Sequence, residues 1–118
     1  MNSPLRILIV EDEPLIAMML EDFVETLGHS CVGTADTVAG AIALSDQQSF
    51  DAAILDVNLR GGEQCWPVAD KLADAGKRYL LASGGQTEAR PGRHLDAPIL
   101  AKPFTMDGVR IALDSLSS

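Results

Sequence analysis

Five short apolar runs recur along the chain, separated by longer stretches in which apolar and polar residues mix. The runs cover Leu5–Val10, Ser30–Thr34, Ala52–Leu55, Tyr79–Ala82 and Ile99–Ala101. They have the length of strands, and most are continuously apolar instead of alternating with polar residues. We therefore predict five strands with both faces covered, as in a parallel sheet.

Four of the longer stretches predict helices. The first begins at Pro14, a residue favoured in a first helical turn, and ends before Gly28, a favoured C-terminal cap. The other three cover Thr37–Gln48, Glu63–Ala75 and Met106–Leu116. The alternation of strands and helices predicts an α/β fold with a doubly wound parallel sheet, in one domain over residues 1–118.

One stretch, Gly84–Pro98, breaks this rhythm. It contains several glycines and prolines and shows little apolar periodicity. We expect the fourth helix, which would lie here, to be short or irregular.

Polar residues follow four of the predicted strands. Glu11 and Asp12 come after the first strand, Asp56 after the third, Ser83 after the fourth and Lys102 after the fifth. Ligands of open parallel sheets bind at the carboxyl ends of the strands, so these side chains are expected to share one site.

Three carboxylates in one site repel one another unless a cation neutralises them, and Mg²⁺ suits a site with few carboxylates. We expect Asp12, Asp56 and a backbone carbonyl near Asn58 to be its ligands, with Glu11 acting through water. A second oxygen of Asp56 is then free to attack a phosphoryl group.

Lys102 would stabilise the charge of the transferring group, and Ser83 would donate a hydrogen bond to it. Taken singly, each of these residues has a plainer explanation. Glu11 and Asp12 could be acids of a first helical turn, and Asp56 could cap a helix or turn. Ser83 could belong to a glycine-rich turn, and Lys102 could be a surface lysine. Their combination at four strand ends favours the site.

Composition narrows the class of protein. Seventeen acidic residues against nine basic ones give a net charge of −8, which argues against nucleic acid or anionic membranes as direct partners. No apolar run approaches the ~20 residues of a membrane span, and two cysteines are too few for a disulfide scaffold, so a cytoplasmic location is expected. Cys31 and Cys65 are expected to be buried or half-buried thiols, and His29 and His94 are given no role.

The segments ILIVEDEP, ILDVNL, LLASGG and LAKPF resemble the receiver domains of two-component response regulators. The resemblance implies a flavodoxin-like fold with strand order 2-1-3-4-5. It also implies that Asp56 is the phosphoacceptor and that Glu11, Asp12 and the Asn58 carbonyl serve the metal. Ser83 and Lys102 become the phosphate-sensing pair, and the Lys102–Pro103 bond is expected to be cis.

The chain departs from the common receiver pattern at two positions. Arg60 replaces a frequent proline, and Ile99 replaces the aromatic residue whose rotation reports phosphorylation. LASGG is similar to the Phe-Ala-Thr-Gly-type motif of a single-domain alphaproteobacterial group, which pairs with histidine kinases of HWE or related type. Without the aromatic, ordering of Gly84–Pro98 on phosphorylation is the expected switch.

The predicted function is Mg²⁺-dependent acceptance of a phosphoryl group from a histidine kinase or phosphotransfer protein. Signalling would follow through protein contact or by acting as a phosphate sink, in a monomer or weak dimer that is not an enzyme for a separate substrate. Alternatives are a receiver excised from a longer regulator and a flavodoxin-type small-ligand binder, although EDEP stands where a glycine-rich phosphate loop would be. A phosphatase of the haloacid-dehalogenase class would need aspartate at Asn58, and the intact acid set argues against a phosphorylation-independent module.

Overall fold

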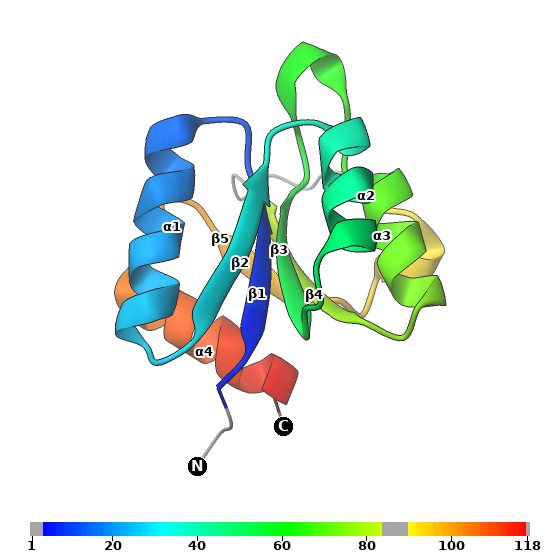
Figure 1. Ribbon diagram of the computed structural model, residues 1–118. Helices are drawn as coiled ribbons and strands as arrows, with labels where there is room; N and C mark the ends of the chain where they lie inside the picture. Colours follow the sequence, from blue (N-terminus) through cyan, green and yellow to red (C-terminus); the bar gives the residue numbers. More distant parts are fainter. Residues whose placement is uncertain (1–3, 84–89, 118) are drawn as a thin grey trace.

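A computed structural model describes residues 4–83 and 90–117, which contain a five-stranded parallel sheet (Figure 1). The strand order is β2-β1-β3-β4-β5, as predicted. The strands are β1 (Arg6–Val10), β2 (Ser30–Ala35), β3 (Ala52–Asp56), β4 (Arg78–Ser83) and β5 (Ile99–Ala101). The flavodoxin-like, doubly wound architecture is therefore confirmed.

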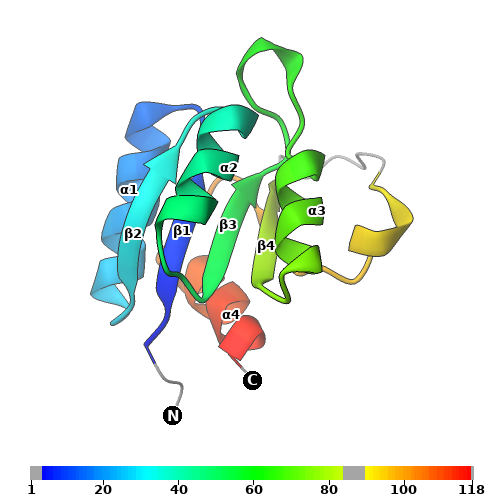
Figure 2. The same cartoon turned by 45° about the vertical axis from the view of Figure 1, so that its right-hand side comes forward.

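Helices cover both faces of the sheet (Figure 2). One face carries α1 and α4, and the other carries α2 and α3. Their bounds are α1 (Pro14–Thr26), α2 (Val38–Gln47), α3 (Trp66–Asp74) and α4 (Met106–Ser117). Successive side chains of a strand point to opposite faces, so Ile7 and Ile9 pack towards α1 and α4 while Leu8 and Val10 pack towards α2 and α3. This arrangement explains why the strands lack polar alternation.

The predicted helix start at Glu63 is wrong, because α3 begins at Trp66. Residues 58–64 instead form a narrow loop, in which Asn58 bridges Gln64 in antiparallel fashion and the Leu59 amide donates to the Glu63 carbonyl at 2.7 Å. Gly61 and Gly62 turn the chain at φ of 75° and 80°, a region that glycine adopts readily. The chain therefore turns at these glycines, and the helix begins only after the loop. The loop projects from the molecule in Figure 2.

The prediction of a short or irregular fourth helix is confirmed within the described part of the chain. Residues 90–98 contain a single 3-10 turn, Gly92–His94. Residues 84–89, the first part of the stretch expected to order on phosphorylation, lie outside the described residues.

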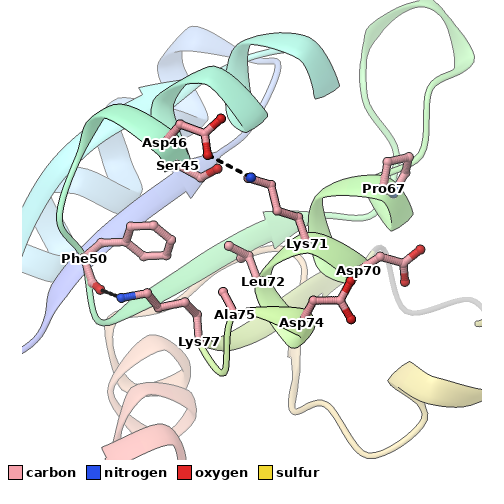
Figure 3. A pocket seen from close by; sticks show the side chains of 10 residues that line it. All are labelled: Ser45, Asp46, Phe50, Pro67, Asp70, Lys71, Leu72, Asp74, Ala75 and Lys77. Atoms are coloured by element: carbon pink, nitrogen blue, oxygen red, sulfur yellow. Dashed lines mark hydrogen bonds and ion pairs between the residues drawn. The ribbon is translucent and has the colours of Figure 1, made fainter.

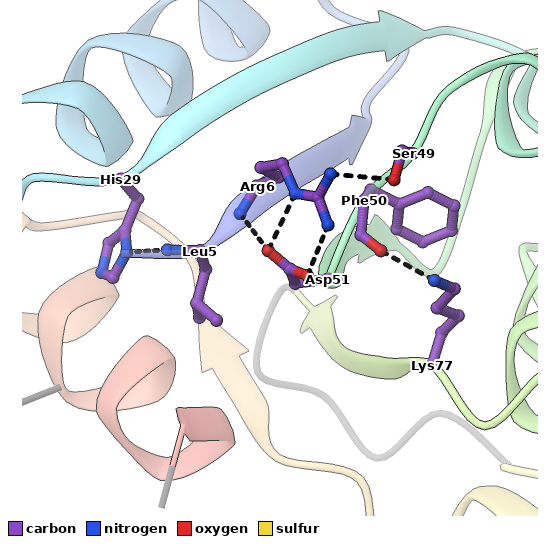
Figure 4. Close-up of polar contacts among 7 residues, drawn as sticks. All are labelled: Leu5, Arg6, His29, Ser49, Phe50, Asp51 and Lys77. Atoms are coloured by element: carbon purple, nitrogen blue, oxygen red, sulfur yellow. Dashed lines mark hydrogen bonds and ion pairs between the residues drawn. The ribbon is translucent and has the colours of Figure 1, made fainter. Parts of the chain in front are cut away.

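Polar contacts fasten the amino ends of the inner strands (Figure 4). The Asp51 carboxylate accepts from the Arg6 backbone amide at 2.9 Å and from the Arg6 guanidinium at 3.1 and 3.2 Å. Nearby, the Lys77 ammonium donates to the Phe50 carbonyl at 2.8 Å. These contacts lie at the opposite end of the sheet from the predicted site. In the described ranges, no helix has the length and apolar character that a membrane crossing requires.

Candidate functional site

The sheet register brings the predicted site residues to one edge. Val10 lies beside Leu55, so Glu11, which follows Val10, and Asp56 leave adjacent strands at the same level. Ser83 ends β4 beside Ala101, and Lys102 follows directly. The carboxyl ends of β1, β3, β4 and β5 therefore supply the site, as the sequence predicted.

Three carboxylates form the centre of the site. Glu11, Asp12 and Asp56 each offer an oxygen within 4.8 Å of the others. Glu11 and Asp56 are each 4% exposed, and Asp12 is half-buried. The Lys102 ammonium lies 3.2 Å from Asp56 Oδ2 and 3.8 Å from Glu11 Oε1. One lysine thus faces two buried acids, and the cluster carries excess negative charge.

The pKa values of these groups reflect burial and crowding. Burial raises the pKa of Glu11 to about 7, and the neighbouring Asp56 adds to the shift. Burial also raises the pKa of Asp56, although Lys102 partly opposes it. For Lys102, burial lowers the pKa, but attraction to Asp56 and Glu11 outweighs it and the net pKa is raised. The site therefore favours an added positive charge.

The donor set fits a small divalent cation. Among the described residues, Glu11 Oε1 is a buried side-chain oxygen without a hydrogen-bond partner. A buried, unsatisfied carboxylate oxygen is costly unless a cation compensates it. Glu11, Asp12 and Asp56 could together hold Mg²⁺, which prefers carboxylate oxygens and retains several waters.

Backbone contacts complete the site. The Asn58 amide donates to Asp56 Oδ1 at 3.3 Å, which orients the carboxylate. The buried Ser83 accepts from the Lys102 amide through its carbonyl at 2.9 Å, so the predicted phosphate-sensing pair is joined between β4 and β5. The Lys102–Pro103 bond is cis, as expected from the resemblance.

We expect the Glu11→Gln variant to be more stable than the wild-type protein at pH 8 in EDTA. A carboxylate whose pKa is higher in the folded protein than in the unfolded chain, about 4.3, costs stability as the pH rises through its folded value, here about 7. The variant should gain up to about 4 kcal/mol in free energy of unfolding at pH 8, the order of magnitude of this linkage. The gain should vanish at pH 4, where both states bind the proton.

Urea denaturation at the two pH values measures this difference. Glu25→Gln, on the exposed face of α1, serves as the control and should leave the stability unchanged at both. A Glu11→Gln variant that is less stable at pH 8 would contradict the assigned charge crowding.

Sequence reasoning missed a second polar cluster, around His94. The ring is fully buried, and it contacts Asp70 of α3 and Tyr79 of β4. The three residues are widely spaced in sequence, so no local motif indicated their contact. Cys31 is half-buried and Cys65 is buried, as predicted.

A groove of about 630 Å³ lies between α2 and α3 (Figure 3). Lys71 of α3 spans it to Asp46 of α2 at 2.8 Å. Phe50 and Lys77, which also line it, precede β3 and β4. The groove therefore lies at the amino ends of the strands, away from the acidic site, where ligands of this fold class do not usually bind.

Comparisons with known proteins agree with the fold. The family model of the response regulator receiver domain matches residues 7–66. The solution structure of SdrG from Sphingomonas melonis is 57% identical, with a TM-score of 0.85 over 98% of both chains. The response regulator PhyR from Brucella abortus is 31% identical, with a TM-score of 0.84 over 98% of this chain and 49% of that one. The predicted likeness to the alphaproteobacterial group is confirmed. That the LASGG segment of this chain corresponds to the fourth-strand motif of the group stays a prediction.

Among curated proteins, the chain is 35% identical to the transcriptional regulatory protein TcrA from Mycobacterium tuberculosis, over 98% of this chain. It is 47% identical to the phyllosphere-induced regulator PhyR from Methylorubrum extorquens, over 48% of this chain. These matches span 47% of TcrA and 22% of that PhyR, so the chain spans about half or less of the curated relatives that it matches.

Proposed function

We propose that this chain, which belongs to the response regulator receiver family, accepts a phosphoryl group on Asp56 in a Mg²⁺-dependent reaction. The observation that carries the proposal is the contact of one lysine, Lys102, with two buried acids, Asp56 and Glu11, of which Glu11 has an oxygen that accepts no hydrogen bond. This arrangement offers a nucleophilic carboxylate, a fixed cation for the phosphoryl oxygens and a place for a metal.

In the proposed reaction, a carboxylate oxygen of Asp56 attacks the phosphorus of a phosphohistidine. The new O–P bond forms as the P–N bond breaks, and the imidazole leaves with the electron pair and takes up a proton. Lys102 holds Asp56 and the developing charge, and Ser83 donates a hydrogen bond to the phosphoryl group. A bound Mg²⁺, held by Glu11, Asp12, Asp56 and the Asn58 carbonyl, would neutralise the phosphoryl oxygens. Water later hydrolyses the acyl phosphate, so the chain acts on itself and not as an enzyme for a separate substrate.

Receiver domains interact with histidine kinases or phosphotransfer proteins. For this chain we propose a kinase of HWE or related type, because SdrG and PhyR are among the relatives that match 98% of this chain. We assign the receiver to residues 1–118 and place it in the cytoplasm as a monomer or weak dimer.

The output would be a protein contact or the draining of phosphate from a shared kinase. A related structure is described as the anti-anti-sigma factor PhyR from Bartonella quintana, 31% identical over 98% of this chain. By this likeness, a component of a sigma-factor pathway is the partner class to test first. A flavodoxin-type ligand site is not favoured, because the strand ends hold acids instead of a phosphate-binding loop.

Incubation with acetyl phosphate and Mg²⁺, followed by intact mass measurement, tests the function. We expect a gain of one phosphoryl group, with no gain in EDTA and loss of the group in neutral hydroxylamine, which cleaves acyl phosphates. The absence of any gain with Mg²⁺ would contradict the proposal, and a gain resistant to hydroxylamine would place the group on another type of side chain.

A further inference from the structure

The buried ring of His94 joins three parts of the molecule. Its Nε2 atom lies 2.7 Å from Asp70 Oδ1, on α3, and its Nδ1 atom bonds the hydroxyl of Tyr79, on β4. Trp66 stacks on the ring at a centroid distance of 5.6 Å and an interplanar angle of 14°. A histidine that has no exposed surface thus uses both ring nitrogens and one ring face.

The proton positions in this chain of contacts follow from the chemistry of its groups. A carboxylate only accepts hydrogen bonds, so His94 Nε2 carries a proton and donates a hydrogen bond to Asp70. In the neutral ring, Nδ1 then accepts from the Tyr79 hydroxyl. Burial raises the pKa of Tyr79, so this hydroxyl keeps its proton at neutral pH. Donors and acceptors are therefore matched from Tyr79 to Asp70.

Further contacts hold the segment around His94, residues 90–98, in place. Arg93 pairs with Asp74 at 2.8 Å and with Asp70 at 3.7 Å. Arg90 donates to the carbonyls of His94 and Ala97 at 3.2 and 3.3 Å. At its end, the Pro98 carbonyl accepts from the Leu81 amide of β4 at 2.9 Å. Residues 91–97 are thus attached to α3 and β4.

We propose that Tyr79, His94 and Asp70 form a latch that holds residues 91–97 against α3 and β4 and so positions the segment that leads into β5. The inference rests on the proposed function only where it concerns the phosphoryl group. Tyr79 and Ser83 belong to the same strand, so a segment fixed to Tyr79 is also fixed relative to the site. A segment already ordered loses less conformational entropy when Ser83 engages the phosphoryl group.

Limited trypsin digestion of the unphosphorylated protein in EDTA tests the latch. Trypsin can cut the Arg93–His94 bond, whereas proline at position 91 protects the Arg90–Pro91 bond. Tyr79→Phe removes the hydroxyl and keeps the ring, and Asp70→Asn removes the carboxylate. Each should accelerate cleavage after Arg93 about fivefold, the change in open population expected for one net hydrogen bond.

Asp74→Asn is the matched control, because it breaks the shorter Arg93 pair and leaves the His94 contacts in place. Its cleavage rate should stay near the wild-type value. Equal acceleration in Asp74→Asn and Asp70→Asn would overturn the latch, since Arg93 would then hold the segment. Wild-type cleavage in Tyr79→Phe, or an equal rise after Arg110 in α4, would also overturn it, the latter by showing global unfolding.

A titration with beryllofluoride and Mg²⁺, followed through the amide resonances of Ser83 and Lys102, tests the positioning. Tyr79→Phe should bind this phosphoryl mimic about fivefold more weakly than the wild-type protein. Unchanged affinity would overturn the positioning role. Failure of the wild-type protein to bind would contradict the proposed function instead, and the trypsin result would still decide the latch.

Discussion

Phosphoryl uptake from acetyl phosphate is expected to fall below detection in the Asp56→Asn variant. The asparagine amide keeps the shape of the side chain, but its oxygen is a poor nucleophile and carries no charge for the metal. The variant should remain folded, because burial raises the pKa of Asp56 and its ionised form therefore costs the folded protein free energy at neutral pH. Intact mass after incubation with Mg²⁺ and acetyl phosphate measures the result.

Asp51→Asn supplies the matched control for this loss. Asp51 precedes β3, whereas Asp56 ends it, and Asp51 pairs with Arg6 at the opposite end of the sheet. This variant should gain one phosphoryl group at the wild-type rate, with a stability loss of about 1 kcal/mol at most for an exposed ion pair. A phosphoryl gain in Asp56→Asn equal to that of the wild type would place the acceptor elsewhere.

The acidic site was predictable because strand ends set its position. A parallel sheet places the residues after each strand on one edge, so Glu11, Asp56 and Lys102 could be brought together from the strand predictions alone. The buried, continuously apolar strands were unambiguous in sequence for the same reason. Neither inference required knowledge of how the helices pack.

The start of α3 was not predictable from apolar spacing, since the residues before Trp66 are compatible with a helical turn. The loop is decided by the pairing of Asn58 with Gln64, a contact across the loop that apolar spacing does not show, and two glycines at positive φ allow the chain to turn there. The His94 cluster escaped prediction for a similar reason. Its partners come from α3 and β4, and only the packing of the segment after β4 brings them together.

Lys102→Ala is expected to change metal binding and phosphoryl transfer in opposite directions. Its ammonium lies 3.2 Å from Asp56 and 3.8 Å from Glu11, so it competes with a divalent cation for the two carboxylates. Without it, Mg²⁺ should bind more tightly, and the metal-free fold should be less stable because the buried acids lose their fixed partner. The phosphorylation rate should fall about 10²–10³-fold, as when one group that stabilises developing charge is removed.

Lys77→Ala separates these effects from a general loss of positive charge. Lys77 donates to the Phe50 carbonyl at the amino ends of the strands, so both Mg²⁺ affinity and phosphorylation rate should keep their wild-type values. Measuring Mg²⁺ affinity and the rate of phosphoryl gain on both variants distinguishes two roles for Lys102. If its only role were to hold the acids together, added Mg²⁺ would restore the rate in Lys102→Ala. If it contacts the phosphoryl oxygens, saturation with Mg²⁺ leaves the rate low, because the metal occupies the carboxylates and cannot take the place of the ammonium.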